Sequence, residues 1–112
     1  MNWIEIKSES DLEKIIKESF RDNTTVAIFK HSTRCSISSV AKNRLESSWD
    51  FNVELPIYYL DLIQYRNISN LIADKFNVQH ESPQLLLIKD GVSIFNASHM
   101  SISVSQIHSV ID

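Results

Sequence analysis

The sequence predicts an α/β protein with a mixed five-stranded sheet and helices on both of its faces. Strand and helix periodicities alternate along the chain, and the last two predicted strands are joined by a tight turn that contains the chain's one glycine, Gly91. Strands connected through helices run parallel, whereas strands joined by a tight turn run antiparallel. The length of 112 residues is typical of one domain, so we expect residues 1–112 to form a single domain.

The first half of the chain is predicted to form a strand, a helix, a strand and a second helix. Residues 3–6 predict a short strand, and Ser10 with Glu13 three residues later predicts a capped helix that ends near residues 22–23. The apolar, β-branched run at residues 25–30 predicts a central strand buried on both faces. Behind a polar turn, apolar residues recur at helical spacing, namely Ile37, Val40, Ala41, Leu45 and Trp49.

The second half is predicted to form a strand, a helix, a hairpin and a final helix. Residues 56–61 predict the third strand, and Asn77 is placed to end the helix that follows it. Residues 84–88 and 92–96 predict two strands joined by a Lys-Asp-Gly turn, and Ser103 is placed to cap the last helix. The resulting order, β-α-β-α-β-α-β-β-α, is the topology of a thioredoxin-like domain.

Composition and charge exclude several classes of function. The chain carries 11 Lys and Arg against 14 Asp and Glu, a formal net charge of -3, which argues against binding to nucleic acid or to an anionic membrane. The apolar runs are too short to span a bilayer, and the N-terminus lacks the pattern of a secretory signal. A single cysteine, Cys35, cannot form an internal disulfide, and a free thiol fits a reducing compartment. We therefore expect a cytoplasmic protein.

Cys35 is placed where the predicted central strand ends and the next helix begins. Free backbone N–H groups and the positive end of the helix dipole stabilise an anion there, which favours the thiolate. Arg34 is adjacent, and Lys30 and His31 precede it closely, so they are expected to add positive potential. Ser38, three residues on, is placed to donate a hydrogen bond to the sulfur. We expect a reactive thiol here; the alternative is a buried structural cysteine.

The segment from Cys35 to Ser38 has the spacing of a Cys-x-x-Cys redox motif, with serine in place of the second cysteine. A dithiol enzyme resolves its mixed disulfide with that second thiol, and this chain has no other cysteine. The chemistry is therefore expected to be monothiol, with an external thiol releasing the bound group. We expect no metal site, because the four histidines show no metal-ligand spacing with Cys35 or with each other: His31, His80, His99 and His108. We also expect no tightly bound cofactor.

Pro83 is the second informative residue, because it lies directly before the predicted fourth strand. Thioredoxin folds place a cis-proline at this point, facing the active cysteine. We therefore expect the Ser82–Pro83 bond to be cis; the alternative is an ordinary trans-proline at a strand start. In the cis arrangement the backbone of Ser82 would pair with an extended substrate beside the sulfur.

These features resemble the YtxJ-like monothiol bacilliredoxins of the bacillithiol redox system. The matching segments are Phe29 to Ser38, Ala41, Glu81 to Gln84 and Lys89 to Gly91. Members of that family commonly carry proline where this chain has Ser36, and the change adds a backbone N–H beside the sulfur. The resemblance implies that Cys35 removes bacillithiol, or a similar low-molecular-weight thiol, from protein mixed disulfides. The small thiol would then be the co-substrate, and S-thiolated proteins would be the partners.

Two other functions stay open on the sequence. A glutaredoxin-like iron–sulfur carrier would use Cys35 as its sole protein ligand, although the Cys-Gly-Phe-Ser pattern typical of such proteins is absent. A non-catalytic thioredoxin-fold binding module would dock a partner along the Ser82–Pro83 edge without thiol exchange. Both alternatives use the same part of the predicted fold, so they differ from the first function in chemistry and not in location.

Overall fold

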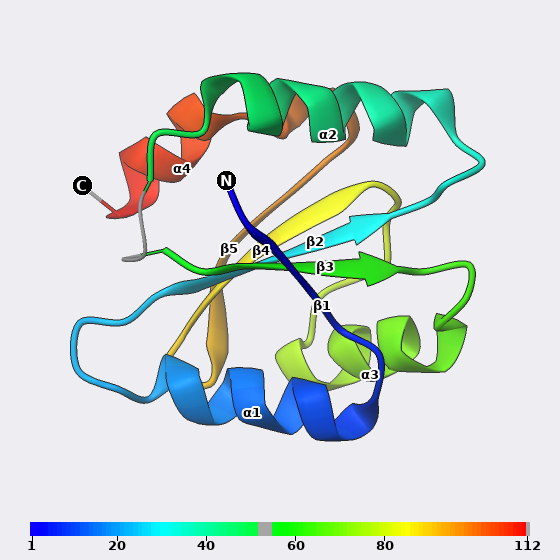
Figure 1. The fold of residues 1–112 in the computed structure, drawn as a ribbon. Helices are drawn as coiled ribbons and strands as arrows, with labels where there is room; N and C mark the ends of the chain where they lie inside the picture. Colours follow the sequence, from blue (N-terminus) through cyan, green and yellow to red (C-terminus); the bar gives the residue numbers. More distant parts are fainter. Residues whose placement is uncertain (52–54, 112) are drawn as a thin grey trace.

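The computed structural model describes residues 1–51 and 55–111, and within them a five-stranded sheet has the order β1-β3-β2-β4-β5 (Figure 1). The strands are β1 (Trp3–Glu5), β2 (Val26–His31), β3 (Ile57–Asp61), β4 (Gln84–Lys89) and β5 (Val92–Ser98). The helices are α1 (Glu9–Ser19), α2 (Ser36–Ser48), α3 (Arg66–Phe76) and α4 (Val104–Ile111), with a short 3-10 helix η1 (His99–Ser101). Strands β1, β3 and β2 run parallel, and β4 and β5 pair antiparallel, as predicted. The expectation that strands connected through helices run parallel is wrong for β4, which pairs antiparallel with β2. After α3 the chain enters β4 opposite Lys30, at the end of β2 and not at its start.

Helices cover both faces of the sheet, α2 and α4 on one side and α1 and α3 on the other (Figure 1). Strand β2 lies in the centre of the sheet and contributes to both apolar layers. Ala27 and Phe29 pack on the side of α2 and α4, whereas Val26 and Ile28 pack on the side of α1 and α3. This alternation is the ordinary consequence of strand geometry. The same alternation places Lys30 and His31, the last two residues of β2, on opposite faces of the sheet.

Helix α1 begins earlier and ends earlier than predicted. The cap is Ser8 and not Ser10: Ser8 has extended backbone, and its Oγ accepts the N–H of Asp11 at 3.1 Å. Ser8 and Asp11 have the same three-residue spacing as the predicted capping pair, so the serine and acid pattern alone does not distinguish the two positions. The helix ends at Ser19 and so stops short of the predicted residues 22–23.

Three local signals in the second half of the chain are confirmed. Asn77 adopts a left-handed conformation (φ 52°) and ends α3. Asp90 and Gly91 both have positive φ, 53° and 75°, as a two-residue hairpin turn requires. Ser103 Oγ accepts a backbone N–H of α4 at 3.2 Å. Across residues 1–51 and 55–111, each helix is too short or too polar to cross a bilayer.

Helix α2 buries a narrower face than its apolar spacing predicts. Its buried residues are Ser38, Ala41 and Leu45, whereas Ile37 and Val40 are each 45% exposed. The apolar spacing continues around the helix beyond the face that contacts the sheet, so two of its members face outward. The first turns of α2 therefore present apolar side chains at the surface next to Cys35.

Candidate functional site

Cys35 is the N-cap residue of α2 and follows the turn that leaves β2. Its backbone is extended (φ −114°, ψ 121°), its N–H donates to the carbonyl of Ser32 at 3.2 Å, and its carbonyl accepts the N–H of Ser39 at 3.1 Å. The residue is partly exposed. The sulfur therefore belongs to a residue at the positive end of a 13-residue helix, where an anion is stabilised.

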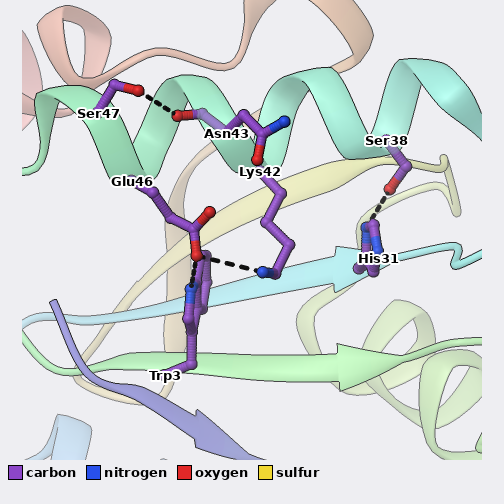
Figure 2. A network of polar contacts seen from close by, with 7 residues as sticks. All are labelled: Trp3, His31, Ser38, Lys42, Asn43, Glu46 and Ser47. Atoms are coloured by element: carbon purple, nitrogen blue, oxygen red, sulfur yellow. Dashed lines mark hydrogen bonds and ion pairs between the residues drawn. The ribbon is translucent and has the colours of Figure 1, made fainter.

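Ser38 makes contacts other than the one predicted for it. It is fully buried, and its Oγ lies 2.6 Å from Nδ1 of His31 (Figure 2). The same oxygen accepts the N–H of Ser32 at 3.0 Å. These two contacts are the hydrogen bonds of the Ser38 hydroxyl, and among the described residues it makes none to the Cys35 sulfur. Ser38 thus joins the end of β2 to the turn that carries Cys35.

His31 is buried beneath α2, and its imidazole is uncharged at neutral pH. Burial lowers the pKa of His31, and the nearby ammonium of Lys42 lowers it further, while the carboxylates of Asp61 and Glu46 act in the opposite direction. The ring is therefore a neutral hydrogen-bonding partner for the Ser38 hydroxyl. It does not supply the positive potential that its sequence neighbourhood had suggested.

A polar network at the middle of α2 ties this helix to β1 (Figure 2). The indole N–H of Trp3 donates to Glu46 Oε2 at 2.9 Å, and the Lys42 ammonium contacts the same oxygen at 3.2 Å. Both hydrogen bonds lower the pKa of Glu46, the Trp3 bond most. The Lys42 ammonium also lies 5.5 Å from the centre of the Trp3 ring. These contacts hold the helix that carries Cys35 against the sheet.

Lys30 enters the opposite side of the sheet, toward α3. The residue is fully buried, and its Nζ donates to the carbonyl of Ser69 at 3.1 Å and to Nδ1 of His80 at 3.3 Å. Burial lowers the pKa of Lys30 to about 8. The prediction of a cation beside the sulfur did not account for strand alternation, which sends Lys30 and His31 to different faces. No signal in the sequence pointed to Ser69.

The Ser82–Pro83 bond is cis, as predicted. Lys30 pairs with Gln84 in the antiparallel β2–β4 ladder, so the residue before Gln84 lies beside the end of β2, where the turn to Cys35 begins. Pro83 is buried and Ser82 is partly exposed. Ser82 and Pro83 are called the cis-proline edge below.

The remaining predicted site residues, Arg34 and Ser36, flank Cys35 and are exposed. With the partly exposed Cys35 and Ser82, they form the accessible part of the site. His31 and Ser38 are buried beneath the turn that carries Cys35, and Lys30 is buried on the other face of the sheet. Within the described ranges, no three His, Cys, Asp or Glu side chains gather as a candidate metal site.

The fold and the site define a thioredoxin-fold protein with one cysteine at the start of α2. The family model for the monothiol bacilliredoxin BrxC matches residues 4–107, and the chain belongs to this family. A solved structure with a thioredoxin fold, provisionally assigned as an oxidoreductase, is 33% identical with a TM-score of 0.84, covering 98% of this chain and 94% of the other.

Two solved thioredoxins show the same fold at lower identity. The thioredoxin of Malassezia sympodialis is 16% identical, with a TM-score of 0.74, and 98% of this chain and 88% of that chain are covered. The thioredoxin of Fasciola hepatica is 19% identical, with a TM-score of 0.70, and the coverage is 96% and 95%. Family and fold together support a thiol oxidoreductase-like role.

Proposed function

We propose that this protein is a monothiol disulfide oxidoreductase that removes bacillithiol, or a similar low-molecular-weight thiol, from protein mixed disulfides. One observation carries the proposal: in a chain of the monothiol bacilliredoxin family, a partly exposed, lone Cys35 caps α2 after the turn that leaves β2, and the cis-proline edge lies at the end of the same strand. The proposed partners are S-thiolated proteins and the small thiol in a reducing cytoplasm. Exchange between sulfur atoms requires no tightly bound cofactor.

The proposed reaction has two exchange steps. The Cys35 thiolate attacks the bacillithiol sulfur of the mixed disulfide, a new S–S bond forms as the old one breaks, and the substrate protein leaves as a thiolate that takes a proton from water. The thiolate of a second bacillithiol then attacks the bacillithiol sulfur held on Cys35. Bacillithiol disulfide leaves, and the Cys35 thiolate is restored. In the net reaction the substrate protein's sulfur is reduced to a thiol, and one free bacillithiol is oxidised as it joins the bacillithiol from the mixed disulfide in one disulfide.

The residues around the sulfur have distinct proposed roles. The start of α2 stabilises the thiolate, and Ser36 adds an N–H there that a proline would lack. Arg34 adds positive charge at the exposed rim. The backbone of Ser82 pairs with an extended segment of the substrate protein, which aligns its mixed disulfide with Cys35.

Intact mass spectrometry tests this proposal directly. The reduced protein is mixed with a bacillithiolated peptide, and we expect Cys35 to gain the mass of one bacillithiol while an equal amount of reduced peptide appears. Cys35→Ala should leave the peptide unchanged. Ser39→Ala, at an exposed serine on the same helix, is the matched control and should react like the wild type.

Two outcomes would contradict the proposal. The first is a peptide that stays bacillithiolated while Cys35 alkylates no faster at pH 7 than a free model thiol. The second is a Cys35→Ser protein that retains a partner in excess reductant, which would indicate a binding module without exchange. Anaerobic reconstitution with iron and sulfide addresses the carrier function, because a protein that stays colourless holds no cluster.

A further inference from the structure

Lys30 is a fully buried lysine, and no carboxylate among the described residues contacts its ammonium. A buried cation without a charged partner is rare, because removing the charge from water is costly. Burial lowers the pKa of Lys30 to about 8, and the group still carries its proton for the most part at neutral pH. An apolar side chain would fill this place in the core at lower cost, so the ammonium requires an explanation.

The ammonium and a serine hydroxyl together hold His80. Lys30 Nζ lies 3.3 Å and Ser69 Oγ lies 3.2 Å from the same atom, Nδ1 of His80. Burial lowers the pKa of His80, as do the charges of Lys30 and Arg66, while Glu81 acts in the opposite direction. The imidazole is therefore uncharged at neutral pH and available as a hydrogen-bond acceptor for the ammonium.

The same buried layer also fastens the chain on either side of His80. Gln84 lies directly opposite Lys30 in the β2–β4 ladder, and its Nε2 donates to the carbonyl of Gln79 at 3.0 Å. The other amide atom, Gln84 Oε1, is buried and has no partner among the described residues. Polar contacts thus attach residues 79–84 to the core, and this segment includes the cis-proline edge.

We propose that Lys30 is a positioning residue for the cis-proline edge: its ammonium fixes His80 and thereby sets the placement of Ser82 for an extended substrate. His80 is two residues from Ser82, so displacement of its ring moves the backbone that pairs with the substrate. On the outer side, the carbonyl of Pro83 accepts the N–H of His99 at 3.1 Å. The inference rests on the proposed function, because it assigns Lys30 a part in docking the mixed disulfide.

Two reactions of Cys35 separate docking from the reactivity of the sulfur. Alkylation by iodoacetamide requires only the thiolate, whereas exchange with a bacillithiolated peptide also requires the edge. In Lys30→Met we expect exchange to slow by about tenfold, since small displacements of a substrate cost large factors in rate, with alkylation unchanged. The loss should appear mainly in KM, because the edge binds the peptide and does not take part in sulfur chemistry.

Matched variants sharpen the test. His80→Phe keeps an aromatic ring but removes Nδ1, and it should reproduce the loss of exchange even if Lys30→Met folds poorly. The double variant should be no slower than either single variant, because both remove the same contact. Lys75→Met is the control: this lysine lies on α3 in an exposed ion pair with Glu13, 3.3 Å apart, and both rates should be unchanged.

Hydrogen–deuterium exchange followed by NMR gives a readout that does not depend on the substrate. The N–H of His99 donates to the carbonyl of Pro83 at 3.1 Å, so its protection reports on the placement of the cis-proline edge. This N–H should exchange faster in Lys30→Met and His80→Phe than in the wild type, and at the wild-type rate in Lys75→Met. Unchanged protection of the His99 N–H in both variants overturns the inference, as does a rate of thiol exchange with the peptide equal to that of the wild type. A parallel loss of thiol exchange and alkylation in folded Lys30→Met also overturns it, since the charge would then act at the sulfur. A wild-type protein that alkylates but does not exchange thiols overturns the proposed function, and the protection of the His99 N–H still decides the role of Lys30.

Discussion

Lys30 and His31 are neighbours on β2, yet the sheet buries them on opposite faces and by different means. His31 is uncharged and shares a hydrogen bond of 2.6 Å with the Ser38 hydroxyl beneath α2. The Lys30 ammonium lies under α3 and donates hydrogen bonds to a backbone carbonyl and to the His80 imidazole. One strand end therefore supports the Cys35 turn from one side and the cis-proline edge from the other.

The comparison shows that the two supports differ in cost. A neutral pair that satisfies both partners removes little stability, whereas a buried charge without a carboxylate removes more. Burial of polar side chains at the end of β2 therefore lowers the stability of the fold little on the side of α2 and more on the side of α3. Substitutions on each face test this difference.

The largest effect is expected from Lys30→Met, which should raise the free energy of unfolding at pH 7 by about 2 kcal/mol. The pKa of Lys30 is about 8 in the folded protein against an ordinary value of 10.5, so the unfolded chain binds the proton more tightly. The wild type therefore gains stability as the pH rises from 8 to 10.5, and the variant's advantage should shrink over the same interval. Urea denaturation at several pH values measures this, and an advantage that does not vary with pH would contradict it.

A smaller effect of opposite sign is expected from Ser38→Ala. The substitution leaves the N–H of Ser32 and Nδ1 of His31 without their partner, which should lower the free energy of unfolding by about 1–2 kcal/mol. Ser39→Ala, at the exposed neighbouring position, should change it by less than about 0.5 kcal/mol. Urea denaturation of both variants compares them, and equal effects would show that the buried hydroxyl adds nothing to stability.

The smallest effect is expected at the two outer ion pairs, one on each side of the sheet. Glu46→Gln removes the charge that contacts Lys42, and Glu13→Gln does the same for Lys75. Exposed pairs of this kind contribute roughly 0.2–1 kcal/mol, and the contribution weakens at high salt. Thermal unfolding at low and high salt measures both. A loss at Glu46 that is large and independent of salt would show that the Trp3 hydrogen bond, and not the charge, attaches α2 to β1.

Much of the fold was predictable because its signals are local. Asn77 and Gly91 mark a helix end and a hairpin turn through their own backbone preferences. Strand and helix periodicities then determine the order of elements, and the order restricts the topology. The start of α1 was misplaced because Ser8 and Ser10 offer the same local pattern, and only the hydrogen bond of Ser8 to Asp11 distinguishes them.

The candidate site was predictable in outline. The lone Cys35 between strand and helix, and Pro83 before β4, both lie where the sequence placed them. The support of the site was not predictable to the same degree. Closeness in sequence suggested that Lys30 and His31 both add charge near the sulfur, but strand alternation separates them. The two-residue period of a strand by itself indicates that Lys30 and His31 lie on opposite faces of the sheet.

The sequence by itself determined the order of helices and strands, the single thiol and its place at a helix start, because these depend on periodicity, turn residues and residue counts. Only the tertiary structure decided what surrounds each buried polar side chain. Lys30 finds its partners 39 and 50 residues away, at Ser69 and His80, and such contacts leave no periodic signal in the chain. The physical reason is that a buried polar group must be satisfied wherever folding brings a partner, and folding brings partners together without regard to sequence distance.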